Sequence, residues 1–264
     1  MGERTEHAPG TFSWVDVAST DLDGSTAFYE ALLGWEHVDF PIGDGSVYRM
    51  FQLRGKNVAA GAEQRDEERS HGVPPHWNNY VTVKSVDETA ERVSELGGNL
   101  MTDPFDVFDS GRMTVLSDPT GAVLCVWEAR ANIGAELVND PGCLTWNELS
   151  TTDVDRAKGF YADLFGWSYE DVGSDEMPYT TIRNGDRMNG GIRPLGEEEQ
   201  QMGVPSNWIP YFTSADLDRS ATQIGELGGQ VMVGPMPVLQ GSRIAISRDP
   251  QGAVFALFEG ETES

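Results

Sequence analysis

The sequence predicts an α+β protein of four βαβββ modules, two in each of two tandem domains. The first observation is a duplication: residues 10–36, GTFSWVDVASTDLDGSTAFYEALLGWE, align without gaps on residues 142–168, GCLTWNELSTTDVDRAKGFYADLFGWS. Residues 76–100 align on residues 207–231 in the same way. The second observation is that one pattern, a strand and a helix followed by short strands, occurs twice within each copy. A repeat of this length indicates two homologous domains.

The first module begins with a strand over residues 11–20, because TFSWVDVAST alternates apolar and polar residues. Asp21 follows it as the N-cap of a helix. Apolar residues then form one helical stripe and Gly34 ends the helix. The stripe consists of Ala27, Phe28, Ala31 and Leu32. The strands that should follow lie at residues 35–40, 47–54 and 57–62.

The second module begins at residue 77 with the strand WNNYVTVKS. The helix VDETAERVSEL comes next and ends at Gly97 and Gly98. Further strands are expected near residues 99–102, 111–117 and 122–129. The acidic runs at 62–72 and 196–203 are interpreted as solvated connections between modules.

These patterns divide the chain into two domains joined by a polar linker. The predicted parts are an N-terminal tail (1–9), domain 1 (10–129), the linker (130–141), domain 2 (142–260) and a C-terminal tail (261–264).

The composition restricts the classes of partner. The formal net charge of −25 disfavours nucleic acid and anionic membranes. No stretch approaches the roughly 20 apolar residues of a membrane span, and the first residues contain no apolar signal segment, so we expect a cytoplasmic protein. Cys125 and Cys143 are expected to be free thiols. The acidic excess with only three lysines favours a cytoplasm of high ionic strength, with a GC-rich genome as the alternative.

The motifs FYEALLGW and FYADLFGW, with strands entered through DPTG and DPQG, resemble the vicinal oxygen chelate superfamily. That superfamily includes glyoxalases, bleomycin-resistance proteins and extradiol dioxygenases. The resemblance covers residues 10–260 and is closest to tandem glyoxalase-like proteins of the actinobacterial culture-filtrate-antigen type. It implies two curved mixed sheets, each forming a cup for a small molecule.

Metal-dependent members of that superfamily bind a divalent ion through a His, a His or Gln, and a Glu. The resemblance places these ligands on Trp14, Asn78 and Cys125 in domain 1, and on Trp146, Ile209 and Ala256 in domain 2. Asn78 could offer a weak oxygen ligand and Cys125 a soft one. Neither domain preserves the triad, so no metal is predicted, although a divalent ion on other ligands stays open.

The other candidate ligands are interpreted differently. Glu128 and Glu259 lie three residues beyond the ligand position and should point to the opposite face of their strands, as structural residues. His76 is expected to be a surface or pocket-rim residue rather than a ligand.

Strand parity predicts which side chains line the cups. Aromatic and a few polar residues should form walls for a flat, mostly apolar molecule. The predicted lining residues are Trp14, Tyr48, Asn78, Tyr80, Arg112, Cys125, Trp127, Trp146, Tyr179, Tyr211, Arg243 and Phe258. Cys125 is interpreted as a packed, unreactive thiol.

Asp16 and Glu148 are the candidate catalytic residues. Each follows a tryptophan by two residues and should share its face, inside the cup. Burial would raise the carboxyl pKa and suit a general base or proton shuttle. The alternative is a buried ion pair with Arg112 or Arg243.

Three functions remain in competition. The first is a metal-independent protein, monomer or homodimer, that binds or sequesters an aromatic or apolar metabolite. The alternative is a lyase, isomerase or dioxygenase-type enzyme of the same superfamily, using Asp16 or Glu148 or an unorthodox metal site. The third is a scaffold whose cups have collapsed. If only one cup binds, we expect the first.

Overall fold

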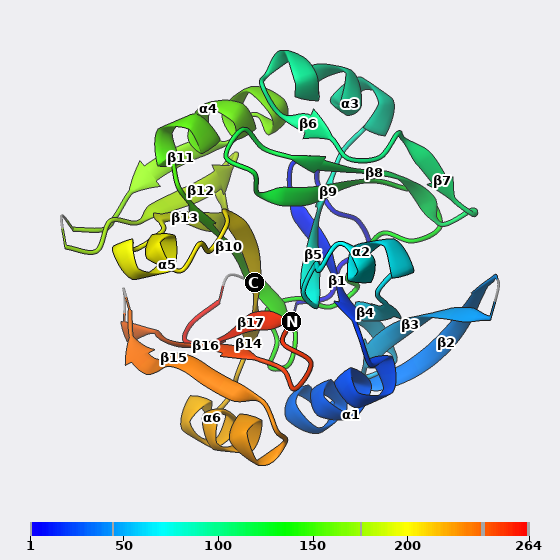
Figure 1. Ribbon diagram of the computed structural model, residues 1–264, viewed down its shortest axis with the longest axis vertical. Coiled ribbons are helices and arrows are strands. Elements are labelled where there is room, and N and C mark those ends of the chain that lie inside the picture. The colour runs from blue at the N-terminus through cyan, green and yellow to red at the C-terminus, as the bar shows by residue number, and fades with distance from the viewer. Residues whose placement is uncertain (1, 44, 175, 239–240, 263–264) are drawn as a thin grey trace.

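The computed structural model describes residues 2–43, 45–174, 176–238 and 241–262 (Figure 1). Residues of domain 1 form one sheet. Its strands are β1 (Phe12–Ser19), β2 (Glu36–Gly43), β3 (Ser46–Leu53), β4 (Lys56–Glu63), β5 (His76–Thr82), β6 (Asn99–Leu100), β7 (Phe105–Val107), β8 (Gly111–Ser117) and β9 (Val123–Ala129). Its helices are α1 (Leu22–Leu33), α2 (Asp66–Ser70) and α3 (Val86–Glu95). The strand order is β2-β3-β4-β1-β5-β9-β8-β6, with β7 paired to β8.

Residues of domain 2 repeat this arrangement. The strands are β10 (Leu144–Thr151), β11 (Ser168–Asp171), β12 (Thr180–Asn184), β13 (Arg187–Pro194), β14 (Asn207–Thr213), β15 (Gln230–Pro237), β16 (Arg243–Arg248) and β17 (Val254–Glu259). The helices are α4 (Val154–Phe165), α5 (Glu197–Gln201) and α6 (Leu217–Glu226). The order is β11-β12-β13-β10-β14-β17-β16-β15. The predicted α+β fold of two tandem domains is confirmed, while the boundaries of the domains stay predictions.

Both sheets are mixed, and each joins its two modules at the centre. Strand β1 pairs parallel with β4 and antiparallel with β5, and β10 makes the same pairs with β13 and β14. Small differences from the expected elements occur at the edges: β6 has two residues, β7 was not predicted, and the acidic runs contain the short helices α2 and α5.

The main hydrophobic cores cross the domain boundary. Helix α1 lies beside α6, and α3 lies beside α4 (Figure 1). One core joins Phe28 of α1 to Phe212 and Phe255 of the second sheet. The other joins Tyr161 of α4 to Leu124 of the first sheet. Each sheet therefore buries its helix-covered face against elements of both domains, which leaves the other face for the cups.

Polar contacts connect the two domains within this core. Asn147 on β10 donates to Asn79 on β5 at 2.7 Å. Asp249, in the turn before β17, accepts a hydrogen bond from the Tyr29 hydroxyl of α1 at 3.1 Å. Because unpaired buried polar groups are costly, these contacts favour one relative position of the two sheets.

The glutamates that end both repeated strands are structural, as predicted. A Glu128 carboxylate oxygen accepts the Val86 backbone N–H at the start of α3, at 3.0 Å. Glu259 accepts the Leu217 N–H at the start of α6, at 3.1 Å. A carboxylate at a helix N-terminus satisfies a free N–H and interacts favourably with the helix dipole.

None of the helices in the described ranges is long and apolar enough to cross a membrane. Cys125 and Cys143 are free and buried, as expected.

Candidate functional site

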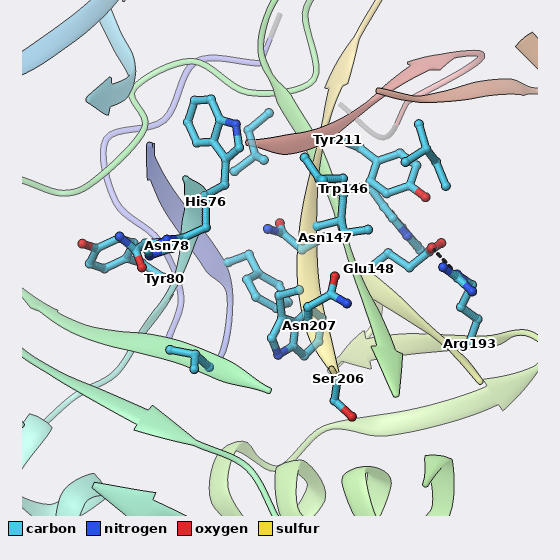
Figure 2. A pocket seen from close by; sticks show the side chains of 18 of the residues that line it. His76, Asn78, Tyr80, Trp146, Asn147, Glu148, Arg193, Ser206, Asn207 and Tyr211 are labelled. Atoms are coloured by element: carbon cyan, nitrogen blue, oxygen red, sulfur yellow. Dashed lines mark hydrogen bonds and ion pairs between the residues drawn. The ribbon is translucent and has the colours of Figure 1, made fainter. Parts of the chain in front are cut away.

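A cavity of about 2530 Å³ is bordered by side chains of both sheets. Figure 2 shows Asn78 and Tyr80 of the first sheet on one side of it and Glu148, Arg193 and Tyr211 on the other. We call its two ends the cups. The first cup comprises Asp16, Tyr48, Asn78, Tyr80 and Cys125, and the second cup comprises Trp146, Glu148, Tyr179, Ile209, Tyr211 and Phe258.

Asp16 lies at the centre of the first cup and has all its partners within the protein. The hydroxyls of Tyr48 and Tyr80 donate to its Oδ2 at 2.9 and 2.7 Å. The Asn78 amide donates to Oδ1 at 2.9 Å. Burial raises the pKa of Asp16, and these three hydrogen bonds oppose the increase. These three hydrogen bonds occupy most of the acceptor positions of the carboxylate.

The linker covers part of the first cup. Ala135 and Val138 pack on its apolar side chains. The Trp127 indole donates to the Asn132 carbonyl at 2.9 Å, and a His7 ring nitrogen lies 2.8 Å from the Ala135 carbonyl oxygen. These contacts hold the linker against the first cup, whose polar residues Asp16 and Asn78 still border the cavity.

The second cup is more open. Trp14 and Trp127 are only 4% and 6% exposed, whereas their equivalents in the repeat, Trp146 and Phe258, are half-buried.

Glu148 occupies the position of Asp16 but has a charged partner. Its Oε1 lies 3.3 Å from the Arg193 Nε (Figure 2). The Arg193 guanidinium also donates two hydrogen bonds of 2.7 Å to Glu199. Burial raises the pKa of Glu148, although Arg193 and the neighbouring tyrosines Tyr179 and Tyr211 oppose the increase. A buried carboxyl group of raised pKa thus borders an open cavity.

The two tyrosines of the second cup are held differently. The Trp146 indole donates to the Tyr179 hydroxyl at 2.9 Å, as Trp14 does to Tyr48. A Cβ atom at Gly191 would lie 2.0 Å from the Tyr179 hydroxyl, so this position requires glycine. The environment of the Tyr211 side chain differs from that of Tyr179.

The Tyr211 hydroxyl is buried without a hydrogen-bond partner of ordinary geometry among the described residues. The residue is 2% exposed and borders the cavity. Its equivalent Tyr80 donates to Asp16 at 2.7 Å. The Tyr211 hydroxyl lies close enough to Glu148 to oppose the increase in the pKa of that carboxyl group, but the two groups do not have the geometry of an ordinary hydrogen bond. A buried unpaired hydroxyl costs about 1–3 kcal/mol, which a ligand oxygen in the cup would offset.

The structure turns two predicted lining residues away from the cups. Arg112 contacts Asp87 and Asp106 at 2.8 and 3.1 Å, and Arg243 contacts Asp218 and Glu259 at 2.7 and 3.1 Å. The proposed ion pairs of Arg112 with Asp16 and of Arg243 with Glu148 are therefore wrong.

The reason is the register of β8 and β16. Met113 and Val115 lie directly opposite Trp127 and Cys125, so they share the cup face, and Ile244 and Ile246 do the same in domain 2. Counting alternate residues along β8 and β16 alone placed Arg112 and Arg243 on the wrong face of the sheet. Arg193 was also missed; it lies opposite Ser150 in the parallel pair of β10 and β13, a pairing that the linear pattern did not indicate.

The side chains at the family metal positions do not fit a divalent ion. Asn78 turns its amide N–H toward Asp16, and the indole N–H groups of Trp14 and Trp146 donate to tyrosines. Burial raises the pKa of Cys125, which keeps its thiol protonated. In the described parts of the chain, no group of three or more His, Cys, Asp and Glu could hold a metal. His76 borders the cavity, with its Nδ1 at 2.9 Å from the Pro74 carbonyl oxygen.

The pKa of Glu148 predicts a dependence of stability on pH. The folded-state pKa lies above the ordinary value of 4.5. Between pH 4.5 and the folded-state pKa, Glu148 therefore keeps a proton in the folded protein that the unfolded chain releases. This contribution is complete below pH 4.5 and is lost as the pH rises through the folded pKa. The Glu148→Gln variant should therefore gain stability relative to the wild type as the pH rises. Urea denaturation between about pH 5 and pH 8 measures this difference, with a slope of at most about 1.4 kcal/mol per pH unit. Parallel curves for the two proteins would contradict it.

Comparison with known proteins agrees with this geometry. The family model of the glyoxalase/bleomycin resistance protein/dioxygenase superfamily matches residues 11–126 and again residues 144–257. CFP32 of Mycobacterium tuberculosis, whose name describes it as a candidate glyoxylase, is 38% identical over 98% of both chains. The anthracycline biosynthesis protein DauV of a Streptomyces species is 32% identical over 97% of this chain and 95% of its own.

Solved structures of lower identity share the fold. The Mn(II)-bound glyoxalase from Novosphingobium aromaticivorans has a TM-score of 0.67 at 16% identity, covering 95% of this chain and 82% of that one. The 2,3-dioxygenase LapB from Pseudomonas has a TM-score of 0.66 at 12% identity, covering 97% and 96%. The repeated family match and the full-length relatives show that the chain belongs to the glyoxalase/bleomycin resistance protein/dioxygenase superfamily.

Proposed function

We propose that this protein binds an aromatic or apolar metabolite in its second cup, without the metal of its superfamily, and sequesters or carries it. The observation that carries the proposal is the buried Tyr211 hydroxyl, which lacks a hydrogen bond of ordinary geometry within the described residues and lies, beside Glu148, on a mainly aromatic and aliphatic wall. A ligand with a carbonyl or ether oxygen would accept its hydrogen bond, while the rings pack on Trp146 and Phe258.

The first cup is the weaker candidate, contrary to our expectation from sequence. Asp16 already accepts three hydrogen bonds, and linker residues pack on the apolar side chains there. We infer that this network stabilises domain 1 rather than binding a ligand. The two free, buried cysteines support a reducing compartment, the cytoplasm.

A two-ring ketone, 1-tetralone, tests the proposal because it offers one oxygen and one aromatic ring. Titration of the chelator-treated protein, followed by tryptophan fluorescence, should show saturable binding at one site. Addition of Mn²⁺ or Zn²⁺ should leave the affinity unchanged. No binding, or binding that requires the metal, would contradict the proposal.

The same titration distinguishes the enzyme alternative. Glu148 has a raised pKa and lies beside the Tyr211 hydroxyl, an arrangement that suits proton abstraction next to a carbonyl group. The carboxylate would take the proton, and the electron pair would move to the carbonyl oxygen held by Tyr211. In D2O, deuterium incorporation at the tetralone carbon next to the carbonyl, lost in Glu148→Gln, would favour an isomerase-type enzyme. Ketone recovered without deuterium favours the binding protein.

A further inference from the structure

The methionines of this protein gather on the cavity. The sequence has nine, of which eight lie in the described ranges. Seven of these eight border the cavity: Met101, Met113, Met177, Met188, Met202, Met232 and Met236. The remaining one, Met50, is buried in the core of domain 1. The distribution is specific to the site rather than spread over the surface.

Four of these residues are exposed and belong to domain 2. Met177 precedes β12, Met188 lies on β13, Met202 follows α5 and Met232 lies on β15. In Figure 1, α5 lies between β13 and β15, with β12 beside β13. Met177 and Met202 are 65% and 74% exposed. We call Met177, Met188, Met202 and Met232 the methionine rim.

Exposed apolar side chains are common singly, but a group of them around one cavity indicates a binding surface. Methionine is unbranched and polarisable, so it adjusts to different shapes and makes favourable sulfur contacts with aromatic rings. The wall inside the rim is aromatic and contains the unpaired Tyr211 hydroxyl. Rim and wall together favour one planar aromatic occupant over a polar one.

We propose that the methionine rim binds the outer rings of a planar ligand with three or more fused rings. This inference rests on the proposed function, in which the inner ring and its oxygen lie at Trp146 and Tyr211. The flexible thioethers close over the part of the ligand that extends beyond the cup. The rim therefore selects for ligand size while accepting different substituents on the outer rings.

The charge of the protein favours a small molecule over a second copy of the chain. At −25, two copies repel each other, and the rim residue Met202 directly follows the acidic helix α5, Glu197–Gln201. Dimers seen by size-exclusion chromatography that dissociate on Met→Gln substitution in the rim would overturn the assignment of the rim to a ligand.

The test compares a three-ring and a two-ring probe. Quinizarin, with three fused rings and carbonyl oxygens, should reach the rim, whereas 1-tetralone should not. The double variant Met177→Gln/Met202→Gln keeps the length of both side chains but makes them polar. Its dissociation constant for quinizarin should rise about tenfold, the loss expected from two sulfur–aromatic contacts and their burial. Its affinity for 1-tetralone should stay within about twofold of the wild type.

Met101→Gln is the matched control, since Met101 is also exposed and borders the cavity at the first cup. It should change neither affinity, and Met177→Leu/Met202→Leu should retain most of the quinizarin affinity. An unchanged quinizarin affinity in the Gln double variant, or an equal loss for both probes, would overturn the inference and leave the proposed function standing. Failure of the wild type to bind 1-tetralone would instead overturn the proposed function.

Discussion

Replacing Asp249 with alanine is expected to lower the free energy of unfolding by about 3 kcal/mol. The carboxylate oxygen Oδ1 accepts the backbone N–H groups of Gln251, Gly252 and Ala253 at 2.8–3.0 Å. Oδ2 accepts the Tyr29 hydroxyl from the other domain. Burial raises the pKa of Asp249, and these four hydrogen bonds oppose the increase. They are therefore the main interactions that stabilise the buried carboxylate. A fifth, longer hydrogen bond comes from the Ser25 hydroxyl, 3.4 Å from Oδ2. Alanine removes the side-chain acceptor of all five donors, although the Gly252 N–H also donates to the backbone carbonyl of residue 249 at 3.0 Å.

Urea denaturation followed by tryptophan fluorescence measures this loss. Asp66→Ala is the matched control, because Asp66 is almost fully exposed and contacts only Arg69. It should change the free energy of unfolding by less than about 0.5 kcal/mol. A loss of less than about 1 kcal/mol in Asp249→Ala would show that the DPQG turn and the domain contact do not depend on this carboxylate.

Trp146→Ala is expected to weaken 1-tetralone binding about 30-fold, equivalent to about 2 kcal/mol. The indole is half-buried beside the cavity and also donates to the Tyr179 hydroxyl at 2.9 Å. Its removal deletes the aromatic wall and frees Tyr179 to move. Because Trp146 is not part of either large interdomain core, the variant should fold.

Phe105→Ala provides the control for the loss of an aromatic ring. Phe105 is exposed and borders the same cavity beside the first cup. Its replacement should leave 1-tetralone affinity within about twofold of the wild type. If Phe105→Ala weakened binding more than Trp146→Ala, the ligand would belong to the first cup.

The family and the weak fit of its metal site were accessible from the sequence because both depend on residue identity at fixed spacing. The repeat placed Trp146 on Trp14 and Glu148 on Asp16, and that alignment is enough to recognise a duplicated module. The strand-end residues Glu128 and Glu259 were also interpreted correctly, because alternation along one strand is a local property.

Side-chain direction across neighbouring strands was predicted less well. Arg112 and Arg243 were assigned to the cups by counting along β8 and β16, but pairing with β9 and β17 sets their face. We propose the second cup rather than the first for a similar reason. The sequence shows a linker of suitable polarity, but only the folded chain places Ala135 and Val138 on the first cup.

The amino-acid sequence by itself therefore determined the repeated modules and the family. These properties follow from local periodicity and from residue identity. Only the tertiary structure decided that Asp16 accepts hydrogen bonds from Tyr48, Tyr80 and Asn78, while the Tyr211 hydroxyl makes no hydrogen bond of ordinary geometry within the described part of the chain. Differences of this kind depend on distances of a few tenths of an ångström between strands far apart in sequence, because a hydrogen bond requires close and aligned partners.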